Sequence, residues 1–205
     1  MDFLLRKAIP EDSAQAVPLI AATIAGYGVM TLGLGDEALE MNALATWFAL
    51  PGNRFSYEYC WLAIVDGETA GLLLIFRGDE IPKLEGGLVR GIFKIYRSMQ
   101  IFGMVWRLLI LSHTGEARRN EFLIAHLAVA PKFQRKGVAQ FLLKKAEFET
   151  RQNKLSRLVL EVEIDNIPAE SLYQKFGFTR EHTTRFNRRA RILKCPGFHK
   201  LVKIV

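Results

Sequence analysis

Short apolar runs alternate along the chain with longer stretches in which apolar residues recur every three or four positions. Residues 3–8, FLLRKA, predict a short first strand, and a helical pattern follows it. Residues 37–50 contain good helix formers behind a candidate helix cap at Asp36. Two apolar runs joined by an Asp-Gly pair predict a β-hairpin over residues 59–76. The first third of the chain therefore mixes strands and helices.

The remainder begins with a helical segment and ends in strands. Residues 78–119 mix large apolar residues with scattered arginine and lysine, which predicts one or two amphipathic helices. After them come a strand at 122–129, a helix at 137–152, a strand at 157–164, a short helix at 169–175, a weaker strand from Phe178 and a C-terminal strand at 198–205. Strand, helix and strand in succession predict a βαβ unit with parallel strands. Since no internal repeat or linker is visible, we expect one α/β domain of the α+β type over residues 1–205, with a helical insert at 78–119.

Composition permits a sizeable buried core. Half of the 205 residues are hydrophobic and 24% are charged, which is typical of a folded chain. The formal net charge of +7 fits a nucleic acid, a membrane surface or an anionic cofactor, and selects none of them. The start of the chain lacks the basic end and long apolar middle of a signal peptide, and we expect no transmembrane segment.

The cysteines and histidines indicate neither a disulfide framework nor a metal. Cys60 lies in an apolar strand-like run and Cys195 in a basic tail, without ligand spacing between them. A reduced, cytoplasmic compartment fits best. His113, His182 and His199 are scattered, so we assign no metal.

The junction after the strand at 122–129 has the composition of an anion site. Arg135, Lys136 and Gly137 stand where the next helix begins. The first amides of a helix lack partners within it and carry partial positive charge, so a phosphate group can bind there. Glycine lets the backbone come close to such a ligand. Taken alone, these residues favour an ordinary solvated loop.

Two motifs that bracket the βαβ unit make the junction more specific. The first motif begins with glutamine or arginine, continues with two residues of any type and a glycine, and ends with one residue of any type and a glycine or alanine. The second motif contains an asparagine, then a small residue, then the pair Leu-Tyr and the pair Gly-Phe. The matching residues are Gln134, Gly137 and Ala139, followed by Asn166, Ala169, Leu172, Tyr173, Gly177 and Phe178. In order and spacing the chain resembles the GNAT superfamily of N-acetyltransferases, most closely over residues 122–179. The resemblance is weaker over the start and the hairpin, and it fails over 78–119.

The resemblance implies a GNAT-type fold, with a central mixed and mostly antiparallel sheet of about six or seven strands and flanking helices. It also implies that acetyl-CoA is the acyl donor and that the bound anion is its pyrophosphate. The residues implied to bind it are Leu127, Ala128 and Val129 along the pantetheine arm, Gln134, Arg135, Lys136, Gly137, Val138, Ala139 and Gln140 around the pyrophosphate, and Asn166 near the pantetheine or holding the loop.

Acetyl transfer to an amine needs a base for the amine and an acid for the departing thiolate. Tyr173 occupies the position where related enzymes often place the acid, although it could simply pack. Glu161 resembles in position the base proposed for ribosomal-protein alanine acetyltransferases, although it could lie on a wet strand face. His126 has a suitable unperturbed pKa, but a lone histidine in a buried strand is more often a core residue. Many relatives use only a chain of water molecules.

The function implied is direct transfer of an acetyl group from acetyl-CoA to a primary amine, on a small molecule or a peptide. The alternative is a non-catalytic acyl-CoA-binding module or sensor. We expect no nucleic acid partner, although the basic tail at 179–194 leaves that hypothesis open, with a solvated hairpin as the simpler interpretation. Dimerisation is common in the family, but no stretch of this sequence indicates it.

The insert allows three interpretations. The simplest is a pair of extra helices that pack on the sheet. The second is a lid over the acceptor, lined by Phe93, Tyr96, Phe102 or Trp106. The third is an amphipathic segment that lies on a membrane surface.

Overall fold

A computed structural model describes residues 3–111, 116–186 and 195–205 of the chain. Its strands are β1 (Leu4–Lys7), β2 (Cys60–Val65), β3 (Glu68–Arg77), β4 (Phe122–Val129), β5 (Arg157–Glu163), β6 (Thr179–Arg185) and β7 (Gly197–Ile204). They form a seven-stranded sheet in the order β1-β2-β3-β4-β5-β7-β6. Every neighbouring pair is antiparallel except β4 and β5, which are parallel. The predicted mixed, mostly antiparallel sheet is confirmed.

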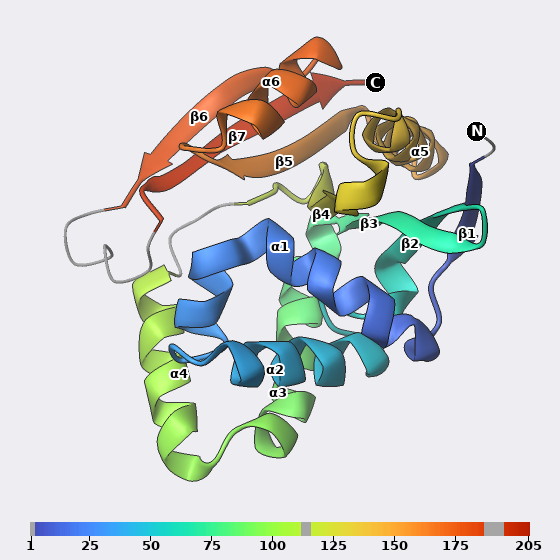
Figure 1. The fold of residues 1–205 in the computed structure, drawn as a ribbon. Coiled ribbons are helices and arrows are strands. Elements are labelled where there is room, and N and C mark those ends of the chain that lie inside the picture. The colour runs from blue at the N-terminus through green and yellow to red at the C-terminus, as the bar shows by residue number, and fades with distance from the viewer. Residues whose placement is uncertain (1–2, 112–115, 187–194) are drawn as a thin grey trace.

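Helices cover both faces of this sheet (Figure 1). They are α1 (Ser13–Thr31), α2 (Glu37–Ala49), α3 (Ile81–Ile95), α4 (Ser98–Leu111), α5 (Val138–Gln152) and α6 (Ile167–Lys175). Helices α1 to α4 share one core with one face of the sheet, and α5 and α6 share a second core with the other face. We call these the α1 face and the α5 face.

Alternation along the central strands produces the two cores. Leu72 and Leu74 of β3 enter the core on the α1 face, whereas Leu73 and Ile75 enter the core on the α5 face. All four side chains are buried. A strand covered on both faces must be apolar at every position, which is why β3 and β4 are nearly continuous hydrophobic runs.

The predicted helix cap, hairpin turn and weaker strand occur at the expected residues. The side chain of Asp36 accepts hydrogen bonds from the N–H groups of Ala38 and Leu39 at 2.8 and 3.3 Å, which caps α2. Asp66 and Gly67 both have positive φ, at 50° and 79°, as a tight hairpin turn between β2 and β3 requires. The weaker strand from Phe178 is β6, which forms an antiparallel pair with β7. Residues 187–194 of the basic tail lie outside the described residues.

The insert is helical, as predicted, but its helices pack mainly on other helices. Helix α3 contacts α2, and α4 contacts α1. Leu84, Ile95 and Met104 join the core on the α1 face. Tyr96 is buried, and its hydroxyl donates a hydrogen bond to the carbonyl of Leu32 at 2.7 Å. Within the described residues, no helix is both long and apolar enough to cross a bilayer.

Candidate active site

The sheet opens between its two parallel strands. Strands β4 and β5 pair only where Phe122–Ile124 meet Leu158–Leu160. Beyond that point β4 stays with β3 and β5 stays with β7, so the carboxyl-terminal halves of the parallel strands separate. A bulge lies at the same place, because Ile124 and His126 pair with neighbouring residues of β3 and Ala125 has no opposite residue.

The separation leaves backbone groups of β4 without a strand partner. The N–H group of Ala130 donates to the carbonyl of Ala70 at 2.9 Å, toward β3. Because backbone groups alternate in direction along a strand, those of Leu127 and Val129 point away from β3, into the gap. These are two of the residues for which the sequence predicted contacts with a pantetheine arm. An extended ligand with amide groups could make the hydrogen bonds to this part of β4 that β5 does not make.

The loop after β4 presents backbone and positive charge to solvent. Gly137 has a φ of 89° and stands at the N-cap of α5, where no side chain caps the helix and no acidic residue lies in the first turn. Arg135 also has positive φ, at 59°, and such conformations in non-glycine residues concentrate at functional sites. Gln134, Arg135, Lys136 and Gln140 are exposed. The first amides of α5 are therefore accessible to an anion.

Asn166 has a local structural task. It is the N-cap of α6, and its side chain accepts a hydrogen bond from the N–H group of Ala169 at 3.2 Å. This contact explains an asparagine three residues before a small residue, without reference to a ligand. Its predicted contact with the donor stays a prediction.

Tyr173 belongs to the core on the α5 face. It is 8% exposed, and its ring lies edge-on to that of Phe178 with centroids 5.8 Å apart. Burial raises the pKa of Tyr173 to about 12, so its hydroxyl stays protonated at neutral pH. Within the described part of the chain, no residue makes a hydrogen bond to that hydroxyl.

Glu161 lies on the opposite face of the sheet from Tyr173. It shares its side of β5 with Val159, which is part of the core on the α1 face. Burial raises the pKa of the Glu161 carboxyl to about 7, and the Glu116 carboxylate adds to the rise while Lys200 and Arg54 oppose it. A carboxyl with this pKa can accept a proton near neutral pH.

His126 is held at the bulge in one defined tautomer. The hydroxyl of Thr23 donates its single proton to the carbonyl of Ile20 at 2.7 Å, so it accepts from Nδ1 of His126, also at 2.7 Å. The proton therefore stays on Nδ1, and the buried Nε2 has no partner among the described residues. Burial, helped by the charge of Arg54, lowers the pKa of His126 to about 3. The ring also stacks on Phe55, with centroids 5.6 Å apart.

Sequence analysis missed three residues that lie near Glu161 and His126. Arg54 donates to the Glu116 carboxylate at 2.7 Å, and both act on the pKa of Glu161 and of Tyr27. Burial and Glu116 raise the pKa of Tyr27. We call Tyr27, Arg54, Glu116, His126 and Glu161 the polar cluster. No local motif joins these residues, because they come from five separate segments of the chain.

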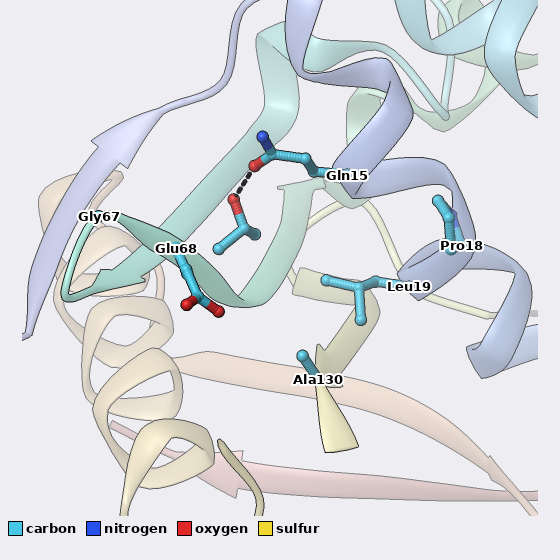
Figure 2. Close-up of a pocket in the computed structure, with 7 residues that line it drawn as sticks. Gln15, Pro18, Leu19, Gly67, Glu68 and Ala130 are labelled. Atoms are coloured by element: carbon cyan, nitrogen blue, oxygen red, sulfur yellow. Dashed lines mark hydrogen bonds between the residues drawn. The ribbon is translucent and has the colours of Figure 1, made fainter. Parts of the chain in front are cut away.

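A separate open hollow of about 390 Å³ borders the end of β4 (Figure 2). It is lined by Gln15, Pro18 and Leu19 of α1, by Gly67, Glu68 and Thr69 at the hairpin, and by Ala130. The hydroxyl of Thr69 contacts the side-chain oxygen of Gln15 across it. None of the predicted site residues lines this hollow, so it is distinct from the opening between β4 and β5.

Within the described residues no group of acidic, histidine and cysteine side chains is arranged to hold a metal ion. Cys60 and Cys195 are both buried and unbridged, and burial raises the pKa of both thiols to about 12. Neither is therefore a thiolate nucleophile at neutral pH. His113 lies outside the described residues.

The divided sheet, with a glycine loop and a helix N-terminus at the mouth of the gap, fits the GNAT-type acetyltransferase fold that the sequence motifs predicted. The model of the acetyltransferase (GNAT) family matches residues 35–178. The chain belongs to this family.

Individual relatives agree with this assignment. The chain is 43% identical to N-alpha-acetyltransferase 30 of Xenopus laevis over 58 residues, which is 28% of this chain and 21% of that protein. It is 41% identical to the human protein of the same name over 58 residues, or 28% of this chain and 16% of that one. The matched stretch thus spans about a fifth or less of these relatives.

Solved structures share the fold over nearly the whole chain. An N-acetyltransferase from Staphylococcus aureus superposes with a TM-score of 0.73 at 20% identity, covering 98% of this chain and 100% of that one. The PaiA N-acetyltransferase of Thermoplasma acidophilum, solved in complex with coenzyme A, superposes with a TM-score of 0.56 at 14% identity over 100% of both chains. At these identities the likeness concerns the fold alone.

Proposed function

We propose that the protein is an N-acetyltransferase that uses acetyl-CoA and transfers the acetyl group directly to a primary amine. The observation that carries this proposal is the opening between β4 and β5, with Tyr173 in the core on one face of the sheet and Glu161 on the other face. Family membership supports the class of reaction.

The residues around the gap fit an acetyl-CoA molecule. The backbone groups of Leu127 and Val129 suit the amides of a pantetheine arm, and the α5 N-terminus with Arg135 and Lys136 suits a pyrophosphate. Gly137 has open space where a side chain would begin, with only Phe3 as near as 4.0 Å. When bound, acetyl-CoA supplies an activated acetyl thioester.

Side chains of the protein accept and donate the protons that the reaction moves. Glu161 accepts a proton from the incoming ammonium, because its raised pKa of about 7 lets it be deprotonated at neutral pH and still be a useful base. The hydroxyl of Tyr173 donates a proton to the thiolate as the C–S bond breaks, and the second proton that the nitrogen loses as the C–N bond forms restores the phenol. Burial makes this phenol a weaker acid, but an apolar site raises the pKa of a thiolate beside it as well.

The test follows release of free thiol from acetyl-CoA with a panel of amines, in wild type and in Tyr173→Phe. Peptides with free N-termini come first in the panel, since the relatives matched over 58 residues are named for N-alpha-acetylation. Small amines, including polyamines, come second. We expect Tyr173→Phe to lower kcat about 100-fold while the affinity for coenzyme A is kept.

Tyr59→Phe is the matched control. Tyr59 precedes β2 and contacts the ring of Phe76, at the end of the sheet away from the gap, with centroids 5.9 Å apart. This variant should keep wild-type kcat. Binding of acetyl-CoA without thiol release for any amine would favour a non-catalytic acyl-CoA-binding module instead.

A further inference from the structure

The turn between α3 and α4 exposes large apolar side chains. Val89 and Phe93 at the end of α3 are 53% and 78% exposed, and Met99 and Phe102 at the start of α4 are 86% and 75% exposed. The last three are the most exposed large apolar side chains in the described part of the chain. Scattered apolar residues are normal on a surface, but a group of this kind marks an interaction site.

Helical spacing puts these side chains in two pairs, one on each side of the turn. Val89 and Phe93 are four residues apart on α3, and Met99 and Phe102 are three apart on α4, so each pair shares a side of its helix. The turn that joins the helices projects from the lower edge of the molecule in Figure 1, away from the sheet. We call this turn, with the helix ends from Val89 to Phe102, the tip. Docking at the tip leaves the gap between β4 and β5 accessible.

The charged residues in the chain segment that forms the turn are all basic. Arg90, Lys94 and Arg97 are exposed there, and the sequence holds no acidic residue from 86 to 115. Arg90 donates to the carbonyls of Pro51 and Gly52, whereas Lys94 and Arg97 form no ion pair with any described residue. The tip therefore combines exposed apolar groups with uncompensated positive charge.

We propose that this tip docks on the surface of an anionic phospholipid bilayer. Phe93, Met99 and Phe102 would insert at the level of the headgroups, and Lys94 and Arg97 would meet the lipid phosphates. A second copy of the chain fits this surface less well, because two such tips would bring cations together without a carboxylate. The proposal does not depend on acetyl transfer, so each can fail without the other.

Flotation of the full chain with vesicles tests the proposal. We expect binding to phosphatidylcholine vesicles that contain phosphatidylglycerol, no binding to pure phosphatidylcholine, and loss of binding at about 1 M salt, where the screening length falls to about 3 Å. The double variants Phe93→Ser with Phe102→Ser, and Lys94→Glu with Arg97→Glu, should each weaken binding about tenfold or more.

Matched changes elsewhere on the surface serve as controls. Phe148→Ser and Lys144→Glu alter exposed residues of α5 and should bind vesicles like wild type. Absence of binding to anionic vesicles, or equal loss in control and tip variants, would overturn the proposal. So would sedimentation showing a wild-type dimer that the Phe93→Ser and Phe102→Ser changes dissociate, since the tip would then join two copies of the chain.

Discussion

Burial has opposite consequences for Glu161 and His126, which lie in the same polar cluster. An apolar environment disfavours the charged form of either group. For Glu161 this raises the pKa into the range where a base works at neutral pH, to about 7. For His126 it lowers the pKa to about 3, so the ring is neutral and a weak base across the physiological range. We therefore favour Glu161 as the base, and His126 as a packed, hydrogen-bonded residue at the bulge.

The change Glu161→Gln tests this choice. In wild type, kcat/KM should rise with pH up to about 7, as the carboxyl loses its proton, and then level off. The glutamine cannot accept the proton, so kcat/KM should fall about 100-fold or more and the dependence near pH 7 should disappear. His126→Gln is the control and should keep the inflection. An inflection that survives in Glu161→Gln would mean that another group is the base.

The same change should alter stability in a pH-dependent way. The folded-state pKa of Glu161 lies above its ordinary value of 4.5, so the protonated form stabilises the fold at low pH, and this stability is lost as pH rises through about 7. Above pH 7 the Gln variant should be more stable than wild type by about 3 kcal/mol, and below pH 4 the two should be similar. Urea unfolding at both extremes measures the difference.

At the scale of elements, helix α3 depends on two adjacent glycines in different ways. A Cβ at Gly87 would lie 1.8 Å from the carbonyl oxygen of Gly52, which is backbone and cannot move cheaply. A Cβ at Gly86 would have nothing within 4 Å. The close approach at Gly87 holds α3 against the loop after α2, and Nε1 of Trp47, within α2, donates to the carbonyl of Leu88 at 2.9 Å.

Alanine at each glycine separates helix propensity from packing. Gly86→Ala should stabilise the protein by about 0.5–1 kcal/mol, because alanine loses less backbone entropy in a helix. Gly87→Ala gains the same helix propensity, but it should destabilise the protein by about 2 kcal/mol because the added methyl group overpacks the contact with Gly52. Denaturant midpoints report both effects. Equal shifts in the two variants would show that α3 does not pack as described.

Most elements could be predicted from local patterns, because each is specified by residues close in sequence. The Asp36 cap, the Asp66-Gly67 turn and the Gly137 loop are all of this kind. The packing of the insert could not be predicted. An amphipathic helix shows which side it buries but not its partner, and α3 and α4 pack mainly on α2 and α1.

At the scale of the whole molecule, the site is assembled from distant segments. The elements of the proposed donor side could be predicted, since the motifs from Gln134 to Phe178 lie within one βαβ unit and its following helix. The polar cluster was not, since Arg54 and Glu116 are 62 residues apart and meet only through tertiary packing. The sheet lies between the two sides, with Tyr173 on one face and Glu161 on the other. The proposed transfer through an opened sheet would therefore depend on the whole fold.

The most direct test of this arrangement is calorimetric titration of acetyl-CoA into wild type, Gly137→Asp and Gly137→Asn. Asparagine and aspartate have the same shape, and both tolerate positive φ and act as helix N-caps, so the pair differs in charge alone. We expect saturable binding to wild type, and an affinity about 100-fold lower for the aspartate than for the asparagine, because a carboxylate repels the pyrophosphate. Equal affinities for the two variants, or no binding to a folded wild type, would contradict the site proposed at this loop.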